Sequence, residues 1–170
     1  MRCKERLEQL LKERGIAYEI MEHRQAFTMP EVAAALHVPG HQVAKVVMVR
    51  AKDELAMLVI SSPDRLHLRK VREVLGRRDV RLAKEGEFAS RFPDCATGAM
   101  PALGSLYGVP TFVDRAVAEQ EQIVFRVGTH HHAMRMSYAD YANLVRPNVT
   151  DLVVREQSAT PPLQAKEAGR

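Results

Sequence analysis

The sequence predicts a single α/β domain with antiparallel strand pairs and outer helices, on three observations. Amphipathic segments with apolar residues at helical spacing alternate with short apolar runs typical of strands. Two of those runs, residues 43–50 and 55–60, are separated only by a polar turn at 52–54, which indicates an antiparallel hairpin. The length of 170 residues and the hydrophobic content of 46% are those of one globular domain.

The N-terminal segment predicts a helix followed by a strand. Leucines stand at positions i, i+3 and i+4 within residues 3–14, and Gly15 suits the residue after a helix. Residues 17–23 then alternate between apolar and polar side chains, as in a half-buried strand.

A capped helix and the longest apolar strand come next. Thr28 is a good N-cap, with Pro30 and Glu31 just inside the helix that it begins. Residues 43–50 form a nearly continuous apolar run, which indicates a central strand, and residues 55–60 form its neighbour.

The remaining elements continue the alternation. We expect a helix at 65–75 closed by Gly76, a short strand at 80–82, a short helix at 85–91, strands at 111–114, 123–127 and 132–136, and a last helix between Ser137 and Pro147. Residues 156–170 are polar and contain two consecutive prolines, so they predict a disordered tail and leave 1–155 as the domain.

Residues 92–110 predict a long, shaped loop. The segment contains three glycines and three prolines among small apolar residues. Loops of this length inside a compact domain are usually functional or disordered, and the apolar composition argues against disorder.

The charge pattern permits a polyanionic partner. The formal net charge is +4, and Arg65 to Arg81 holds seven cations against two anions. This stretch is either a solvated helix face or a surface that follows phosphates, and the sequence leaves both open. The first residues lack the apolar core of a signal peptide, and no apolar run is long enough to span a membrane, so we expect a cytoplasmic protein.

Three residues are candidates for chemistry. Lys45 interrupts an apolar strand, so it is either an outward lysine or a cation facing a carboxylate or phosphate at the mouth of a pocket. Gly98 lets the backbone of the 92–110 loop approach a ligand, and its N–H could stabilise an oxyanion. His130 follows a glycine turn and could form a hydrogen bond to a substrate or move a proton.

Two other patterns offer different chemistry. His130, His131 and His132 are consecutive, but neighbouring side chains on a strand point to opposite faces, and no spacing of Asp, Glu or Cys completes a familiar zinc set. We therefore expect no metal. Cys95 precedes the glycine loop and is either a nucleophile or a small packing residue.

The ordered set of motifs resembles the YbaK/prolyl-tRNA synthetase-associated editing domain family. The strand Val43-Ala-Lys-Val-Val is followed by the loop Thr97-Gly-Ala-Met-Pro-Ala-Leu-Gly and then by the turn Val127-Gly-Thr-His. The resemblance runs from about Thr28 to Val153. It implies an α/β domain around a mixed, barrel-like sheet, and a stand-alone enzyme that hydrolyses the ester of a wrong amino acid on tRNA, mostly tRNA for proline, without a cofactor.

The resemblance also implies roles for particular residues. Lys45 matches the signature lysine that holds the terminal phosphate of the tRNA or positions the ester. Gly98 and Pro101 match the loop that cradles the aminoacyl group, with Met100 and Leu103 as expected pocket walls. Gly128 begins the turn whose histidine, His130, helps to place the substrate. In many members this loop contains two prolines and an aromatic residue, whereas here it reads Gly-Ala-Met-Pro-Ala-Leu-Gly. This difference leaves the identity of the substrate amino acid open.

The implied partners are the acceptor end of an aminoacyl-tRNA and a synthetase, with a monomer and no membrane association as the expected state. Three alternatives stay open: a non-catalytic tRNA or aminoacyl-ligand binding module of the same fold, a metal-dependent hydrolase that uses the three histidines, and an esterase with Cys95 as nucleophile.

Overall fold

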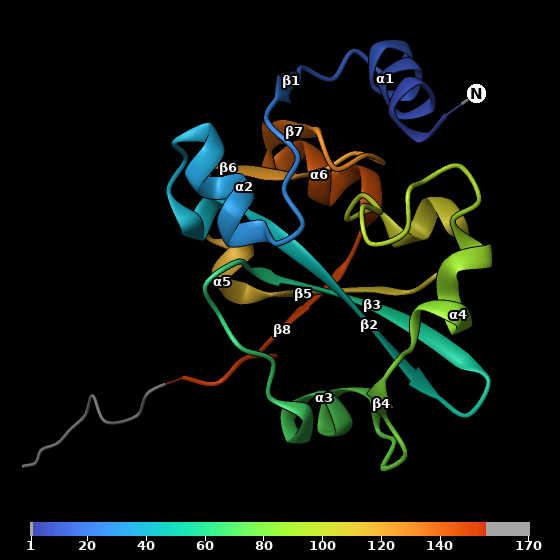
Figure 1. Cartoon of the computed structure of the whole chain (residues 1–170). Helices are drawn as coiled ribbons and strands as arrows, with labels where there is room; N and C mark the ends of the chain where they lie inside the picture. The colour runs from blue at the N-terminus through green and yellow to red at the C-terminus, as the bar shows by residue number, and fades with distance from the viewer. Residues whose placement is uncertain (1, 156–170) are drawn as a thin grey trace, which may run out of the picture.

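The computed structural model describes residues 2–155, which form two sheets surrounded by helices (Figure 1). The helices are α1 (Cys3–Glu13), α2 (Met29–Leu36), α3 (Leu68–Leu75), α4 (Glu85–Phe88), α5 (Arg115–Ala118) and α6 (Tyr138–Val145). The strands are β1 (Glu19–Glu22), β2 (Ala44–Ala51), β3 (Glu54–Ser61), β4 (Arg81–Leu82), β5 (Thr111–Asp114), β6 (Gln122–Arg126), β7 (His132–Ser137) and β8 (Asn148–Thr150).

The larger sheet has the order β4-β2-β3-β5-β8 and mixes antiparallel with parallel pairs. The β2–β3 hairpin pairs Lys45 with Ile60, and β3 continues in parallel to β5. Side chains of β3 point alternately into two hydrophobic clusters: Met57 and Val59 into one, Leu58 and Ile60 into the other. The strand buried on both faces at the centre of this sheet is therefore β3, with β2 beside it.

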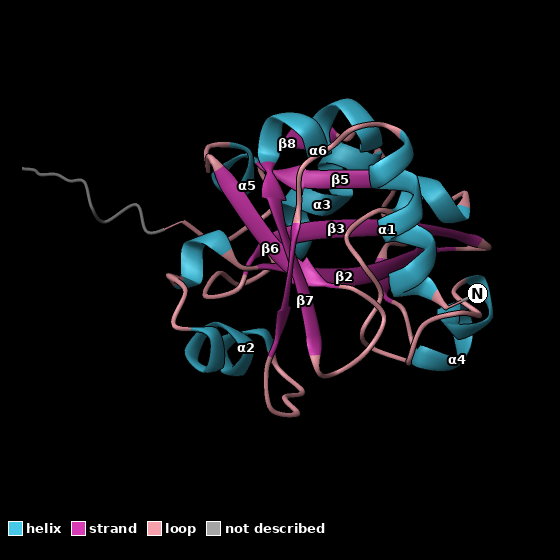
Figure 2. Ribbon diagram, turned by 90° about the horizontal axis from the view of Figure 1, so that it is seen from above, coloured by secondary structure: helices cyan, strands magenta, loops and turns pink. Residues whose placement is uncertain are grey.

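The smaller sheet has the order β1-β7-β6 and is wholly antiparallel. Its strands β6 and β7 cross β2, β3 and β5 at a steep angle (Figure 2). One isolated parallel bridge, between Val43 just before β2 and Val124 in β6, joins the two sheets. The expected α/β domain with mixed strand pairing and surrounding helices is confirmed, and the two sheets meet at this bridge without closing into a barrel.

Local sequence signals explain the helix that leads to the site. The Thr28 hydroxyl accepts a hydrogen bond from the Glu31 amide, and the Glu31 carboxylate accepts one from the Thr28 amide, which is a complete capping box. Pro30 occupies the first turn, where its missing N–H is not needed. The helix ends at His37, which adopts the left-handed conformation with φ of 57°.

Several boundaries differ from the sequence expectations. Helix α3 begins at Leu68 instead of Arg65, since His67 caps it and the preceding residues pair with the end of the described chain. The short elements α5 and β8 were not expected, because four and three residues carry little periodicity. The predicted disordered tail at 156–170 lies outside the described residues.

Candidate functional site

A pocket of about 260 Å³ opens where the two sheets and the 92–110 loop meet. The start of α2, the start of β2, the glycine loop and the end of β6 all contribute to it. Its walls are Phe27, Thr28, Met29, Pro30, Ala44, Lys45, Val46, Gly98, Met100 and Arg126. Two of the three candidate residues, Lys45 and Gly98, therefore lie on one pocket although they are far apart in the chain.

Lys45 is half-buried in the wall of this pocket. Its ammonium donates a hydrogen bond to the Ser62 carbonyl at 3.1 Å, and no ion pair to it occurs within residues 2–155. Burial lowers the pKa of Lys45, and the nearby Asp64 carboxylate opposes that shift only in part. The side chain is thus a desolvated cation with capacity for an anionic partner.

Gly98 sits at the pocket wall with φ of +85°, a conformation that favours glycine. The loop around it is held from both sides by Gly128. The Gly128 carbonyl accepts from the Ala96 amide at 2.9 Å, and the Gly128 amide donates to the Ala99 carbonyl at 2.8 Å. The Gly98 amide itself donates no hydrogen bond in the described part of the chain, so it is available to a ligand.

His130 lies beside Gly98 at the edge of the pocket. A Cβ added to Gly98 would lie 3.9 Å from its Cε1, and its ring packs on Phe27 with 5.1 Å between centroids. Nδ1 is 2.6 Å from Nη1 of Arg126, and because a guanidinium only donates, Nδ1 is the acceptor. Burial, then the Arg126 charge, lowers the pKa of His130, so the ring is neutral near pH 7 with its proton on Nε2.

Arg126 is the site residue that the sequence reasoning missed. It interrupts the apolar run Ile123-Val-Phe-Arg-Val as Lys45 interrupts its own strand, so the same signal was present. The side chain is only 4% exposed and lines the pocket.

The other loop candidates are placed differently from one another. Met100 lines the pocket. Leu103 does not: it is fully buried in the main hydrophobic cluster, away from the pocket wall. Pro101 is a buried residue of the same loop and does not line the pocket. Gly128 does not line the pocket either, but it holds the loop through its two backbone hydrogen bonds.

The three consecutive histidines do not converge. His132 faces Thr129 and Glu22, at 2.8 Å from the Thr129 hydroxyl and 3.5 Å from the Glu22 carboxylate, whereas His131 is exposed. No group of three or more His, Cys, Asp or Glu within residues 2–155 is arranged to hold a metal ion.

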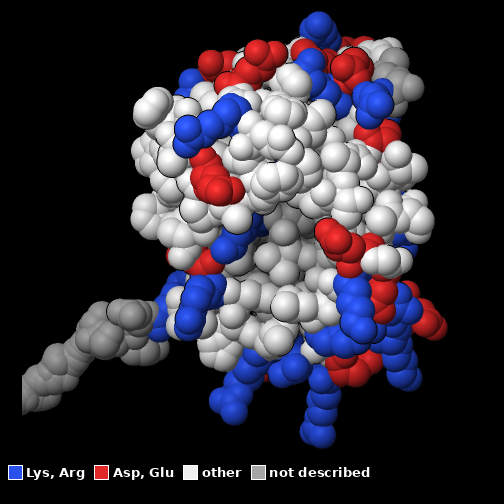
Figure 3. Space-filling model, viewed as in Figure 1, with Lys and Arg blue, Asp and Glu red and all other residues white. Residues whose placement is uncertain are grey.

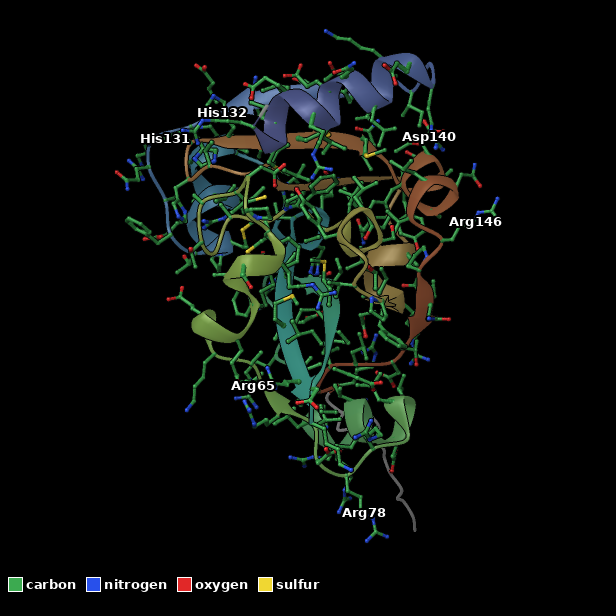
Figure 4. All side chains as sticks on the ribbon, turned by 90° about the vertical axis from the view of Figure 1, so that its right-hand side faces the viewer. Arg65, Arg78, His131, His132, Asp140 and Arg146 are labelled. Carbon is green, nitrogen blue, oxygen red and sulfur yellow. The ribbon has the colours of Figure 1, made fainter. Side chains whose placement is uncertain are left out.

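The basic stretch keeps three exposed arginines without ion pairs among the described residues: Arg65, Arg69 and Arg78. Lysines and arginines gather along the lower side of the molecule, where α3 and β4 lie (Figure 3). Figure 4 shows Arg65 and Arg78 at the opposite end of the molecule from His131 and His132.

Comparison with known proteins decides the family. The model of the aminoacyl-tRNA editing domain matches residues 23–144, which is most of the chain and includes Lys45, Gly98, Arg126 and His130. The chain belongs to the aminoacyl-tRNA editing domain family. A search of curated proteins gave no match for this editing domain.

Solved structures share the fold of this editing domain at low sequence identity. The structure titled "Crystal structure of a putative trans-editing enzyme for prolyl tRNA synthetase" is 21% identical, with a TM-score of 0.78 over 91% of this chain and 99% of that one. A scaffold from a study of "epitope backbone grafting by computational design" is also 21% identical, with a TM-score of 0.79 over 92% of this chain and 99% of that one. Within residues 2–155, no helix of the editing domain is long and apolar enough to cross a membrane.

Proposed function

We propose that this editing domain hydrolyses the ester bond of mischarged aminoacyl-tRNA, with tRNA of the proline type as substrate. One observation carries the proposal: a pocket of about 260 Å³ brings together a desolvated lysine and an unused glycine amide, with a neutral histidine at its edge. These are the groups needed to hold an RNA end, stabilise an oxyanion and orient an ester. Such an activity belongs in the cytoplasm, where tRNA is charged.

The bond to be broken is an activated ester, so water attack needs positioning more than a strong nucleophile. The water adds to the ester carbonyl carbon, and the carbonyl oxygen becomes an oxyanion that the Gly98 amide can stabilise. Collapse of this intermediate breaks the bond to the ribose oxygen, which takes up a proton as it leaves. The neighbouring ribose hydroxyl is the group proposed to activate the water.

His130 acts as a donor in this scheme. Its Nδ1 is occupied by Arg126 and its lowered pKa keeps the ring neutral, so only the Nε2 proton can be donated, and hydrogen bonding with the backbone of Thr97 and Ala26 competes for it. A neutral imidazole whose acceptor nitrogen is occupied is poorly suited to remove a proton from water. His130 therefore orients the substrate or shares in oxyanion stabilisation, while the glycine loop beside it supplies the backbone donor.

The pocket selects by exclusion. Its volume of about 260 Å³ must hold the ester and part of the ribose as well as the side chain, so the side chain is small. Met100 and Ala44 form apolar walls. A hydrophobic pocket separates side chains by only about 1–3 kcal/mol per methylene, which is why a second sieve after synthesis is useful. The acceptor stem would extend toward Arg65, Arg69 and Arg78.

The first experiment is deacylation of a panel of tRNAs charged with Ala, Ser, Cys, Thr or Pro. We expect rapid hydrolysis of one small-residue ester and slow hydrolysis of the Pro ester, measured as loss of radiolabelled amino acid from the tRNA. The matched control is the same panel on a second tRNA with a different acceptor stem, which tests the proposed tRNA type. Binding of charged tRNA without hydrolysis across the panel would instead identify a non-catalytic binding module.

A cysteine substitution tests the esterase alternative. The Cys95 thiol lies 3.4 Å from the Tyr107 hydroxyl and does not line the pocket, and contact with Cys3 together with burial raises its pKa, so it stays protonated. We expect Cys95→Ala to keep deacylation rates within about twofold of the wild type, since thiolate character governs cysteine nucleophilicity. Complete loss of activity in a variant with an unchanged melting temperature would point to nucleophilic chemistry at Cys95.

A further inference from the structure

Arg126 carries a guanidinium that the described residues leave partly unpaired. Its Nε donates to Met29 Sδ at 3.0 Å and its Nη1 donates to His130 Nδ1. Its Nη2 is buried without a hydrogen-bond partner, and no ion pair to Arg126 occurs within residues 2–155. An unsatisfied buried donor costs about 1–3 kcal/mol, and more when it is charged. The two N–H groups on Nη2 therefore favour binding of an acceptor from outside the chain.

The bridge between the sheets sets Arg126 beside Lys45. Val43 and Val124 form a parallel bridge and share one hydrophobic cluster. Side chains two residues further along each strand point to the same face as these valines. Those residues are Lys45 and Arg126, so the bridge aligns two cations on one face.

The pocket between these cations is free of negative charge. Both side chains line it, and none of its lining residues is Asp or Glu. Glu31, the carboxylate that acts to raise the pKa of Arg126, is committed to the amides of Phe27 and Thr28, and Asp64, which acts in the same way on Lys45, does not line the pocket. Two desolvated cations without a carboxylate between them form an electrostatic site for an anion.

We infer that Arg126 is a second cation of the phosphate subsite for which the family resemblance already implies Lys45: Arg126 Nη2 donates to a nonbridging oxygen of the last phosphodiester before the terminal nucleoside of the substrate. The inference rests on the proposed function. A carboxylate and a phosphodiester each offer two equivalent oxygens that share one negative charge, so both fit a pair of cations. The substrate decides between them, because the aminoacyl ester has no free carboxylate until it is hydrolysed, whereas the phosphodiester next to the terminal nucleoside is always charged.

Arg126 also couples this phosphate site to the ester site. Nη1 holds His130, which lies beside Gly98, while Nη2 faces the proposed phosphate. A single planar guanidinium thus fixes the distance between the RNA backbone and the turn that places the ester. A lysine at this position would keep the positive charge but would lose the rigid, planar array of N–H donors.

The test is binding of a short RNA that ends in CCA, in two forms. One has a normal last phosphodiester, and the other has a neutral methylphosphonate at that linkage. Fluorescence anisotropy gives the Kd of each form for wild type, Arg126→Gln and Arg126→Lys. The control variant is Arg146→Gln, because Arg146 is exposed, does not line the pocket and lies across the molecule from His131 and His132 (Figure 4). Thermal melts confirm that each variant is folded.

We expect Arg126→Gln to weaken binding of the phosphodiester RNA by roughly 10- to 100-fold, the range for a hydrogen bond to a charged group. The same variant should bind the methylphosphonate RNA within about twofold of the wild type. Arg126→Lys should fall between wild type and Arg126→Gln, and Arg146→Gln should match the wild type.

Other results overturn the inference in distinguishable ways. Equal weakening of both RNAs by Arg126→Gln would assign Arg126 to holding His130 alone. Unchanged RNA affinity, with inhibition by free amino acid lost, would assign the cation pair to a carboxylate. A wild-type protein that binds neither RNA would contradict the proposed function itself.

Discussion

Replacing Lys45 with methionine is expected to lower kcat/KM for deacylation by about 100-fold or more. The substitution keeps the apolar stem and removes only the ammonium, which is the charged group on the pocket wall nearest the start of β2. A loss of 100-fold corresponds to about 2.7 kcal/mol of transition-state stabilisation, within the range for a preorganised charged donor. Single-turnover hydrolysis of the mischarged tRNA found in the panel measures it, and Lys45→Ala should behave in the same way.

The same variant should be at least as stable as the wild type. The pKa of Lys45 is lowered from 10.5 in the fold, so the unfolded chain binds this proton more tightly than the folded chain does. The fold therefore loses stability as the pH falls from 10.5 through the lowered pKa of the folded state. At neutral pH the lysine is charged in both states, and its charge destabilises the fold. A melting temperature at or above that of the wild type, together with lost activity, would separate a functional role from a structural one. A folded, fully active Lys45→Met protein would contradict the proposed site.

Gly128→Ala is expected to destabilise the fold by about 3 kcal/mol. Gly128 has φ of +97°, which L-residues rarely adopt, and an added Cβ would lie 2.7 Å from Cys3 Cβ. Strain and overpacking each cost about 1–3 kcal/mol. For a chain of this size, 3 kcal/mol lowers the melting temperature by about 6–12 °C.

Gly86→Ala is the matched control for this experiment. Gly86 lies in α4 with ordinary backbone angles, and no atom lies within 4 Å of an added Cβ. Alanine in that helix should stabilise it by up to about 1 kcal/mol. If Gly128→Ala melted like Gly86→Ala, the close approach of Cys3 to Gly128 would not exist as described.

The sequence was most informative where one local signal sufficed. The capping box at Thr28 and the hairpin of β2 and β3 were readable because each depends on residues close together in the chain. The parallel pair of β5 and β8 was not, since its partners are separated by all of β6, β7 and α6. Whether the strands close into a barrel was not readable either, because closure depends on strand pairing between distant segments.

The site shows the same division. Lys45 was found because a cation in an apolar strand is conspicuous, yet the equivalent Arg126 was passed over, since only the bridge between Val43 and Val124 reveals that the two share a face. Met100 and Leu103 could not be told apart from sequence. A loop without periodicity gives no rule for which side chain reaches the pocket, and the fold packs both into the main hydrophobic cluster while only Met100 also lines the pocket.

The pocket is assembled from four separate segments: residues 27–30, 44–46, 98–100 and Arg126. No single segment forms the pocket by itself. The pocket requires contacts between segments that are distant in the chain, and such contacts form only as the whole chain becomes native. A partly folded molecule could keep the β2–β3 hairpin and still have no pocket. Because the same contacts create both the chemistry and the size limit, a molecule that unfolds loses its reactivity together with its selectivity. If deacylation is the activity, as proposed above, an unfolded copy of this protein would hydrolyse neither mischarged nor correctly charged tRNA.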